Sequence, residues 1–105
     1  MRLGAAAITL FVAAAPAAFA GPADDDKVLT IMRTHCVMCH AAKPTHESVQ
    51  EAPKNISLET IADVRKHAAL VYAQTVQTGA MPLGNQTGMT GEERVMLGQW
   101  LKAQQ

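Results

Sequence analysis

The pentapeptide at residues 36–40 constrains this chain more than any other feature. It reads Cys-Val-Met-Cys-His, and its two thiols are the only cysteines in 105 residues. Two thiols three positions apart, followed directly by an imidazole, form the attachment signature of c-type haem. Each thiol would add across one vinyl group of the porphyrin, and the imidazole would then lie under the iron. We therefore expect Cys36 and Cys39 to hold the haem covalently and His40 to bind its iron.

Three other chemistries use a Cys-x-x-Cys pair, namely a thioredoxin-like redox centre, a zinc site and a local disulfide. A redox pair belongs in a βαβ unit, and no strand pattern surrounds these cysteines. A structural zinc site needs four ligands, and the sequence offers no second Cys-x-x-Cys and no closely spaced pair of histidines. Haem attachment is accordingly the preferred interpretation.

Residues 1–20 have the composition of a secretory signal peptide. Arg2 supplies a positive charge, an uninterrupted apolar stretch follows, and residues 18–20, Ala-Phe-Ala, form a small-x-small cleavage pattern. We expect cleavage after Ala20, which leaves a single haem-binding domain of residues 21–105 in the periplasm. The alternative is an uncleaved membrane anchor, whose apolar length would barely span a bilayer. Export agrees with haem attachment, because that reaction takes place outside the bacterial cytoplasm.

The exported part would be short for a self-supporting domain, and a covalently bound haem would supply a large apolar piece of its core. Both phenylalanines, Phe11 and Phe19, fall in the signal segment, which leaves Tyr72 and Trp100 as the aromatic residues of the domain. Removal of the signal segment also leaves one net negative charge. This near balance gives no indication of nucleic acid binding.

The spacing of apolar residues predicts an all-α domain of three to five helices, since no segment alternates with a period of two. The first helix is expected from Asp26 to His35, with acidic residues at the positive end of its dipole. Residues 58–78 form the most helical stretch, either as one helix capped near Thr60 or as two shorter helices broken around His67. In each case one apolar face would meet the haem or the wall of its pocket.

The last helix is expected over residues 91–103. Thr90 and Glu93 form a capping box at its start, which makes Met89 the apolar residue that packs against its first turns. Trp100 lies on the apolar edge, whereas Arg94 is among the polar residues expected to face out. We expect the first and last helices to pack against each other with Trp100 in the contact.

Two methionines compete for the sixth position of the iron. A thioether opposite histidine raises the reduction potential of a haem and closes the iron to external ligands. Met81 lies in a loop opened by Gly79 and stiffened by Pro82, which suits a sulfur held at one place. Met89 is already assigned to helix packing. We therefore expect Met81 to be the sixth ligand, with Met89 as the alternative.

A haem-binding histidine normally donates its second N–H to a carbonyl. Residues 41–57 are polar and predict a long loop, and Pro53 in this loop is the expected source of that carbonyl, with Pro44 as the alternative. His46 is expected in solvent, with a haem propionate contact as its alternative.

Two further side chains near the expected haem allow more than one role. The hydroxyl of Tyr72 could reach a haem propionate, or its ring could pack in the core. His35 is expected to be a partly buried structural residue rather than a second ligand.

The order of these features resembles class I cytochromes c over the whole exported chain. Over residues 36–101, the runs Cys-x-x-Cys-His-Ala, Pro-Thr-His, Ala-Pro-Lys and Met-Pro-Leu-Gly-Asn are similar to the cytochrome c domain at the C-terminus of bacterial membrane-bound urate oxidases. The resemblance implies one haem with His40 and Met81 as axial ligands and an electron-accepting role. In that family the domain is fused to a multi-helix membrane protein, whereas here we expect a stand-alone exported protein without urate chemistry of its own.

Together these features predict a one-electron carrier rather than an enzyme. Its partners would bind transiently, with a urate-oxidising membrane enzyme as a possible donor and a terminal oxidase as acceptor. One alternative is a periplasmic copper-handling protein that uses the six methionines and four histidines as ligands. That alternative is weakened by Met1, the initiator, and by Met32, which lies on a helix stripe. Another alternative is a haem enzyme or gas sensor with an open sixth position.

Overall fold

The computed structural model describes residues 4–10 and 21–105. Residues 4–10 have no regular structure. Most of the expected signal peptide, including the cleavage pattern that ends at Ala20, lies outside the described residues. Within the described ranges, no helix is both long enough and apolar enough to cross a membrane.

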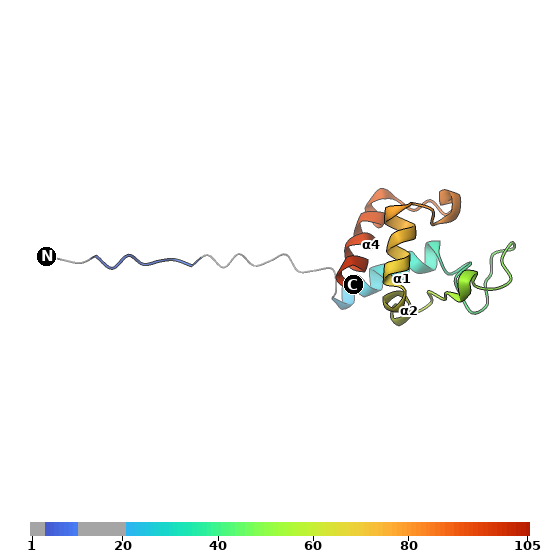
Figure 1. Ribbon diagram of the computed structural model, residues 1–105, viewed down its shortest axis with the longest axis horizontal. Coiled ribbons are helices and arrows are strands. Elements are labelled where there is room, and N and C mark those ends of the chain that lie inside the picture. Colours follow the sequence, from blue (N-terminus) through green and yellow to red (C-terminus); the bar gives the residue numbers. More distant parts are fainter. Residues whose placement is uncertain (1–3, 11–20) are drawn as a thin grey trace.

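All regular structure in the described residues is helical, which confirms the all-α expectation. The elements are α1 (Pro22–His35), η1 (Pro53–Asn55), α2 (Ile61–Lys66), α3 (Ala68–Tyr72), η2 (Ala73–Gln77), η3 (Leu83–Asn85) and α4 (Gly91–Ala103). The elements η1 and η3 are short 3-10 turns, and η2 is a π-helical continuation of α3. Two long loops connect these helices, one between α1 and α2 that contains η1 and one between η2 and α4 that contains η3. Both loops lie at the same end of the domain as the end of α1 (Figure 1).

Helix α1 begins four residues earlier than the sequence pattern predicted. Gly21 is its N-cap, and a proline occupies the first turn, where a missing N–H costs nothing. The carboxylate of Asp24 accepts the Gly21 N–H at 3.3 Å. The first of the three consecutive aspartates therefore bonds to the N-cap backbone at the start of the helix. The expected start at Asp26 was wrong.

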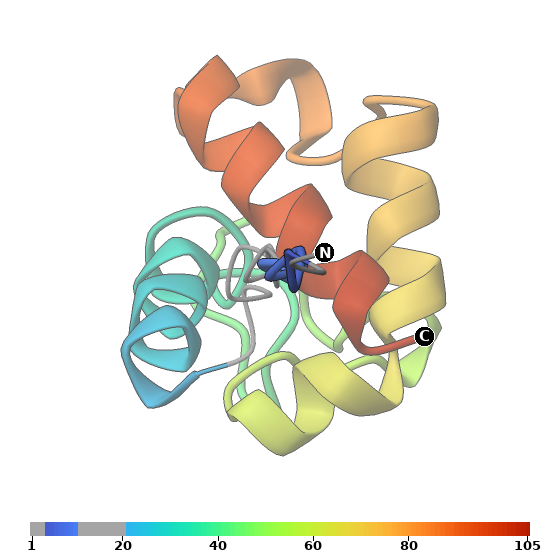
Figure 2. The same cartoon turned by 90° about the vertical axis from the view of Figure 1, so that its left-hand side faces the viewer.

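The long helical stretch is broken at His67, as one of the two alternatives predicted. The backbone of His67 has φ −107° and ψ 17° and separates α2 from α3. Thr60 and Asp63 form the expected capping box, with side-chain to backbone bonds of 3.1 and 3.3 Å. The break lets α3 run in a different direction from α2 and reach α4 (Figure 2).

The core lies where α4 packs between α1 on one side and α3 with η2 on the other (Figure 2). Its largest fully buried side chains are Trp100, Met32, Leu97, Leu101, Val28 and Val64. Gly98 allows the close approach of α4 to η2, because a Cβ there would lie 3.1 Å from Cγ2 of Val76. The predicted contact between the first and last helices is confirmed.

Trp100 joins those two helices by a polar contact as well as by packing. Its indole Nε1 donates to Oδ1 of Asp25 at 2.9 Å. Arg65 of α2 donates to Oδ2 of the same carboxylate at 2.7 Å, and its guanidinium carbon lies 5.7 Å from the Trp100 ring centroid. One carboxylate thus connects α1, α2 and α4.

Candidate cofactor site

The pentapeptide forms a tight turn at the exit of α1. The Cys36 N–H still bonds to Met32 O at 2.9 Å and ends the helix. The N–H groups of Cys39 and His40 then bond to Cys36 O at 3.2 and 2.9 Å. The two thiols and the imidazole are consequently carried by one compact turn whose backbone is held by its own hydrogen bonds.

Both cysteines are free thiols, with Cys36 buried and Cys39 half-buried. Burial, together with the nearby Cys39, raises the pKa of the Cys36 thiol to about 12. A redox-active thiol needs a lowered pKa, because the thiolate is the nucleophile. The environment of Cys36 therefore does not favour the thioredoxin-like alternative, and the disulfide alternative is not formed.

The imidazole of His40 is oriented by the loop that follows it. Its Nδ1 lies 3.0 Å from Ile56 O, so the Nδ1–H donates to that carbonyl. Nε2 is then the nitrogen with a lone pair free for a metal ion. The Leu58 N–H bonds to His40 O at 2.9 Å and brings the end of the loop back to the pentapeptide.

The expectation that Pro53 supplies this carbonyl was wrong. Pro53 opens η1, and its carbonyl accepts the Ile56 N–H at 3.1 Å within that turn. Lys54 and Asn55 both have positive φ, of 53° and 57°, so the chain reverses before Ile56 reaches the histidine. The residue that ends the turn, rather than the proline that begins it, faces His40.

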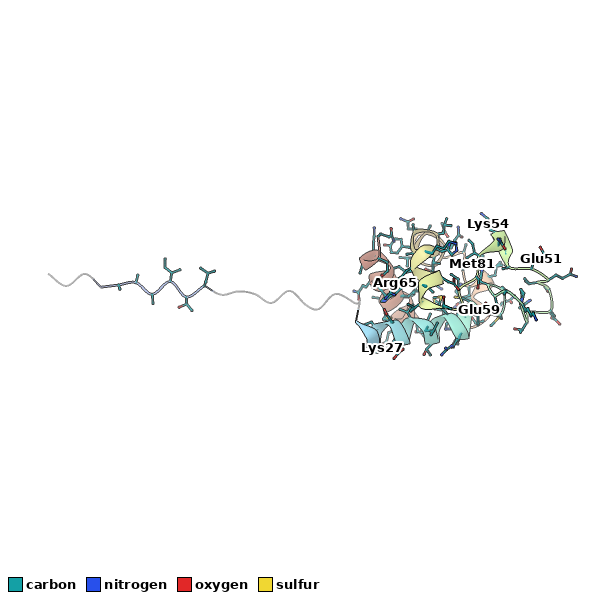
Figure 3. The ribbon with its side chains drawn as sticks, turned by 90° about the horizontal axis from the view of Figure 1, so that it is seen from below. Lys27, Glu51, Lys54, Glu59, Arg65 and Met81 are labelled. Atoms are coloured by element: carbon teal, nitrogen blue, oxygen red, sulfur yellow. The ribbon has the colours of Figure 1, made fainter. Side chains whose placement is uncertain are left out.

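Met81 lies at the same end of the domain as Lys54 and Glu51 of the long loop (Figure 3). Its side chain is half-buried, and its N–H bonds to Gln74 O at 3.0 Å. Its carbonyl accepts a bond of 2.9 Å from the Arg94 guanidinium. The backbone at Met81 is therefore fixed on both sides, while its thioether stays on a loop.

Met89 is buried in the core, as its expected packing role requires. The side-chain amide of Asn85 bonds to both the N–H and the carbonyl of Met89, at 3.0 and 3.2 Å. The Thr90 and Glu93 capping box begins α4 immediately afterwards. The role of Met81 as sixth ligand stays a prediction, and Met89 has the surroundings of a packing residue.

His35 has the structural role expected of it. It is buried, with Nδ1 at 2.8 Å from the Thr87 hydroxyl and Nε2 at 3.0 Å from a Glu93 carboxylate oxygen. The N–H of Thr90 and the ring of His35 lower the pKa of the Glu93 carboxyl. The end of α1 is thereby bonded to both the loop that carries Met81 and the start of α4.

Tyr72 has the packing role that was the alternative to a propionate contact. Its ring lies against α4 beside Gly98, and the Lys102 ammonium is 4.9 Å from the ring centroid. His46 lies in the polar loop, where its Nδ1 accepts the Ser48 N–H at 3.1 Å. The Tyr72 ring thus packs against the core between α3 and α4.

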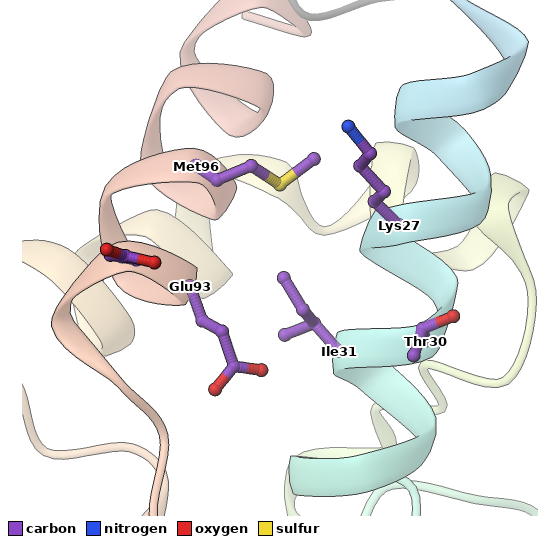
Figure 4. A pocket seen from close by; sticks show the side chains of 6 residues that line it. Lys27, Thr30, Ile31, Glu93 and Met96 are labelled. Carbon is purple, nitrogen blue, oxygen red and sulfur yellow. The ribbon is translucent and has the colours of Figure 1, made fainter.

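Two hollows of the surface lie away from the pentapeptide. One of about 340 Å³ lies between α1 and α4, with Ile31 and Met96 pointing into it and Lys27 at its rim (Figure 4). A second, of about 430 Å³, lies over Tyr72 and Gly98. Neither is lined by a cysteine or by Met81, so the candidate site is defined by the donor groups themselves.

Those donor groups fit a covalently held haem. Two free thiols lie on one turn, one imidazole nitrogen is available, and Met81 offers a thioether from the loop that follows η2. These donor types match the Met and His ligand set of cytochromes c. In the described residues no three His, Cys, Asp or Glu side chains gather as a metal site. Met32 and Met89 are buried, so they serve the core rather than the copper alternative.

Two participants at the site could not be read from the sequence pattern. The Ile56 carbonyl is a backbone group, which side-chain patterns do not reveal. The one signal that points to it is the Pro-Lys-Asn turn, because the carbonyl of the first residue in such a turn accepts the hydrogen bond that closes the turn. Arg94 was expected to face out, and that expectation was wrong, because its guanidinium is directed at the carbonyls of Thr75 and Met81. A cation one turn into a capped helix is the only local sign of it.

Comparisons of the chain with protein-family models, with curated proteins and with solved structures found no match. The functional assignment is therefore argued from the chemistry of the site and from the sequence motifs.

Proposed function

We propose that this chain is an exported monohaem c-type cytochrome that carries single electrons. The observation that supports this most strongly is the bond of 3.0 Å from His40 Nδ1 to Ile56 O, on the same turn as two free thiols. It gives the imidazole the orientation and tautomer that an iron ligand needs. A bound haem would supply one-electron exchange at its iron.

Each residue of the site has a defined task in this proposal. Cys36 and Cys39 would hold the porphyrin by two covalent bonds. The Ile56 carbonyl makes His40 a stronger donor, since a hydrogen bond on the second nitrogen raises ligand basicity. Met81 would supply a soft thioether, which favours the reduced state and excludes external ligands.

The direct test is the absorption spectrum of protein purified from a host that can attach c-type haem. We expect one haem per chain, and we expect that haem to stay with the polypeptide after denaturation and acid-acetone extraction. Release of all haem by the extraction would refute covalent attachment. Copper without haem in the purified protein would favour the copper-handling alternative. Rapid carbon monoxide binding by the unmodified protein would favour the sensor alternative.

Export is part of the same proposal and has its own measurement. The signal-peptide pattern at residues 1–20 supports periplasmic delivery with cleavage after Ala20. N-terminal sequencing of the periplasmic protein should begin at Gly21. An N-terminus that retains the apolar segment, in a membrane fraction, would instead support the anchor.

The partners are proposed from the motif resemblance. A urate-oxidising membrane enzyme would donate electrons, and a terminal oxidase would accept them. Such encounters usually bury less than about 1,200 Å² and are transient. The exposed lysines are spread over the domain rather than gathered in one ring, so we expect a shallow dependence of the reaction rate on ionic strength. They are Lys27, Lys43, Lys54, Lys66 and Lys102.

A genetic test separates this specific role from a general one. Deletion of the gene in a strain that grows on urate should slow urate oxidation. Undiminished oxidation, with no other cytochrome substituting, would leave a general respiratory carrier as the better description.

A further inference from the structure

The loop that carries Met81 is attached to α4 by one arginine. Nη1 of Arg94 donates to two backbone carbonyls, those of Thr75 in η2 and of Met81 at 2.9 Å. The carbonyl of Thr75 lies in the last turn of its helix, where carbonyls have no partner within the helix. A cationic donor is the favourable partner for such a group.

The position of Arg94 follows from the local sequence around the start of α4. The Thr90 hydroxyl accepts the Glu93 N–H at 3.1 Å, and the Glu93 carboxylate accepts the Thr90 N–H at 3.0 Å. The Arg94 N–H bonds to Thr90 O at 3.0 Å as the first regular helical bond. The capping box therefore fixes the helix register that directs this guanidinium back toward Met81.

We propose that Arg94 is the positioning residue for Met81. It holds the Met81 peptide against η2, where the Met81 N–H already bonds to Gln74 O at 3.0 Å, and so restricts the places that the sulfur can occupy. A charge-assisted bond from a planar guanidinium is about twice as strong as a neutral one. The inference rests on the proposed function, in which Met81 binds the iron.

A merely structural arginine gives a suitable contrast at the other end of the domain. Arg65 also joins separate elements through its guanidinium, with Asp25 Oδ2 at 2.7 Å and Gln104 Oε1 at 3.2 Å. Its partners are Asp25, Gln104 and the Trp100 ring, and none of these lies in the loop that carries Met81. Arg65→Met is therefore the matched control for Arg94→Met, because each change removes one guanidinium that connects two elements.

The test measures the loop and the iron separately in the full-length holoprotein. We expect Arg94→Met to raise amide hydrogen exchange at Met81 by at least about tenfold, the loss of one charge-assisted hydrogen bond. The same variant should weaken the sulfur-to-iron charge-transfer band and speed cyanide binding by a similar factor. Arg94→Lys should give exchange and cyanide-binding rates between those of the unmodified protein and those of Arg94→Met, since lysine keeps the charge but not the planar fork.

The control variant Arg65→Met distinguishes a positioning role of Arg94 from a general contribution to the stability of the domain. Arg65→Met should lower the thermal midpoint while leaving exchange at Met81 and cyanide binding within about twofold of the unmodified protein. Equal effects of the two variants on Met81 would overturn the proposal. So would faster exchange in Arg94→Met with an unchanged charge-transfer band. Absence of covalent haem from the unmodified protein would refute the proposed function itself, before any variant is compared.

Discussion

The indole of Trp100 should contribute measurably to stability through its hydrogen bond as well as through its burial. The side chain is fully buried, and its Nε1 donates to the Asp25 carboxylate at 2.9 Å. Trp100→Ala should lower the free energy of unfolding by about 3 to 5 kcal/mol, the range for deleting a buried aromatic side chain. Trp100→Phe keeps most of the ring volume and removes the N–H donor.

The expected cost of Trp100→Phe follows from the surroundings of the carboxylate. A hydrogen bond to a charged group contributes about 1.5 to 3 kcal/mol. Asp25 is partly exposed and keeps its bond to Arg65, so the carboxylate is not left without a partner. The lower end applies, and we expect a loss of about 1 to 2 kcal/mol.

The assay is urea denaturation followed by far-ultraviolet circular dichroism, because the variants lack the only tryptophan. A double-mutant cycle of Trp100→Phe with Asp25→Ala should give a coupling energy of about 1 kcal/mol or more. Additivity of the two changes within about 0.3 kcal/mol would show that the hydrogen bond contributes nothing. A loss below about 1 kcal/mol in Trp100→Ala would show that the indole is peripheral to the core.

Three further predictions concern the site and its supports. Replacement of Cys36 or Cys39 by alanine should weaken or abolish stable holoprotein, read as haem staining on a denaturing gel; undiminished staining in both variants would contradict covalent attachment. Met81→Ala should open the iron to cyanide and lower the reduction potential, whereas Met89→Leu should cost only packing; loss of the charge-transfer band in Met89→Leu would exchange the two roles. The pKa of Glu93 is lowered from its ordinary 4.5, so its stabilising contribution is present above that value and is lost as the pH falls. The urea midpoint of Glu93→Gln should therefore depend less on pH below about 4.5 than that of the unmodified protein, and identical profiles would contradict this role.

Local signals in the sequence predicted the helix starts that depend on local chemistry. The two capping boxes, at Thr60 and Thr90, need only residues three positions away, and both are formed. The predicted start of α1 was wrong because three consecutive aspartates offered three possible capping residues. The Gly-Pro pair before them determines where the helix begins. The periodic apolar positions likewise predicted the contact between α1 and α4, since both stripes need a partner.

Contacts between distant residues could not be predicted in the same way. The partners of His35 lie 52 and 58 positions away, so no pattern around this histidine names them. The acceptor for His40 depends on how a turn of positive φ reverses the chain, and a proline alone does not determine that. Arg94 looked like a solvent-facing cation because helical periodicity places side chains on a face without saying what else reaches that face.

The bond between Trp100 and Asp25 also has a consequence for the order in which the chain matures. The two residues are 75 positions apart, so the bond cannot form until almost the whole polypeptide has been synthesised. The core cluster that buries Cys36 includes Leu97 and Leu101, which arrive equally late. In the proposed export, the pentapeptide would therefore remain reachable by the enzymes that attach haem until the last helix docks. A chain cut short before Trp100 would keep its thiols exposed and would be open to proteases.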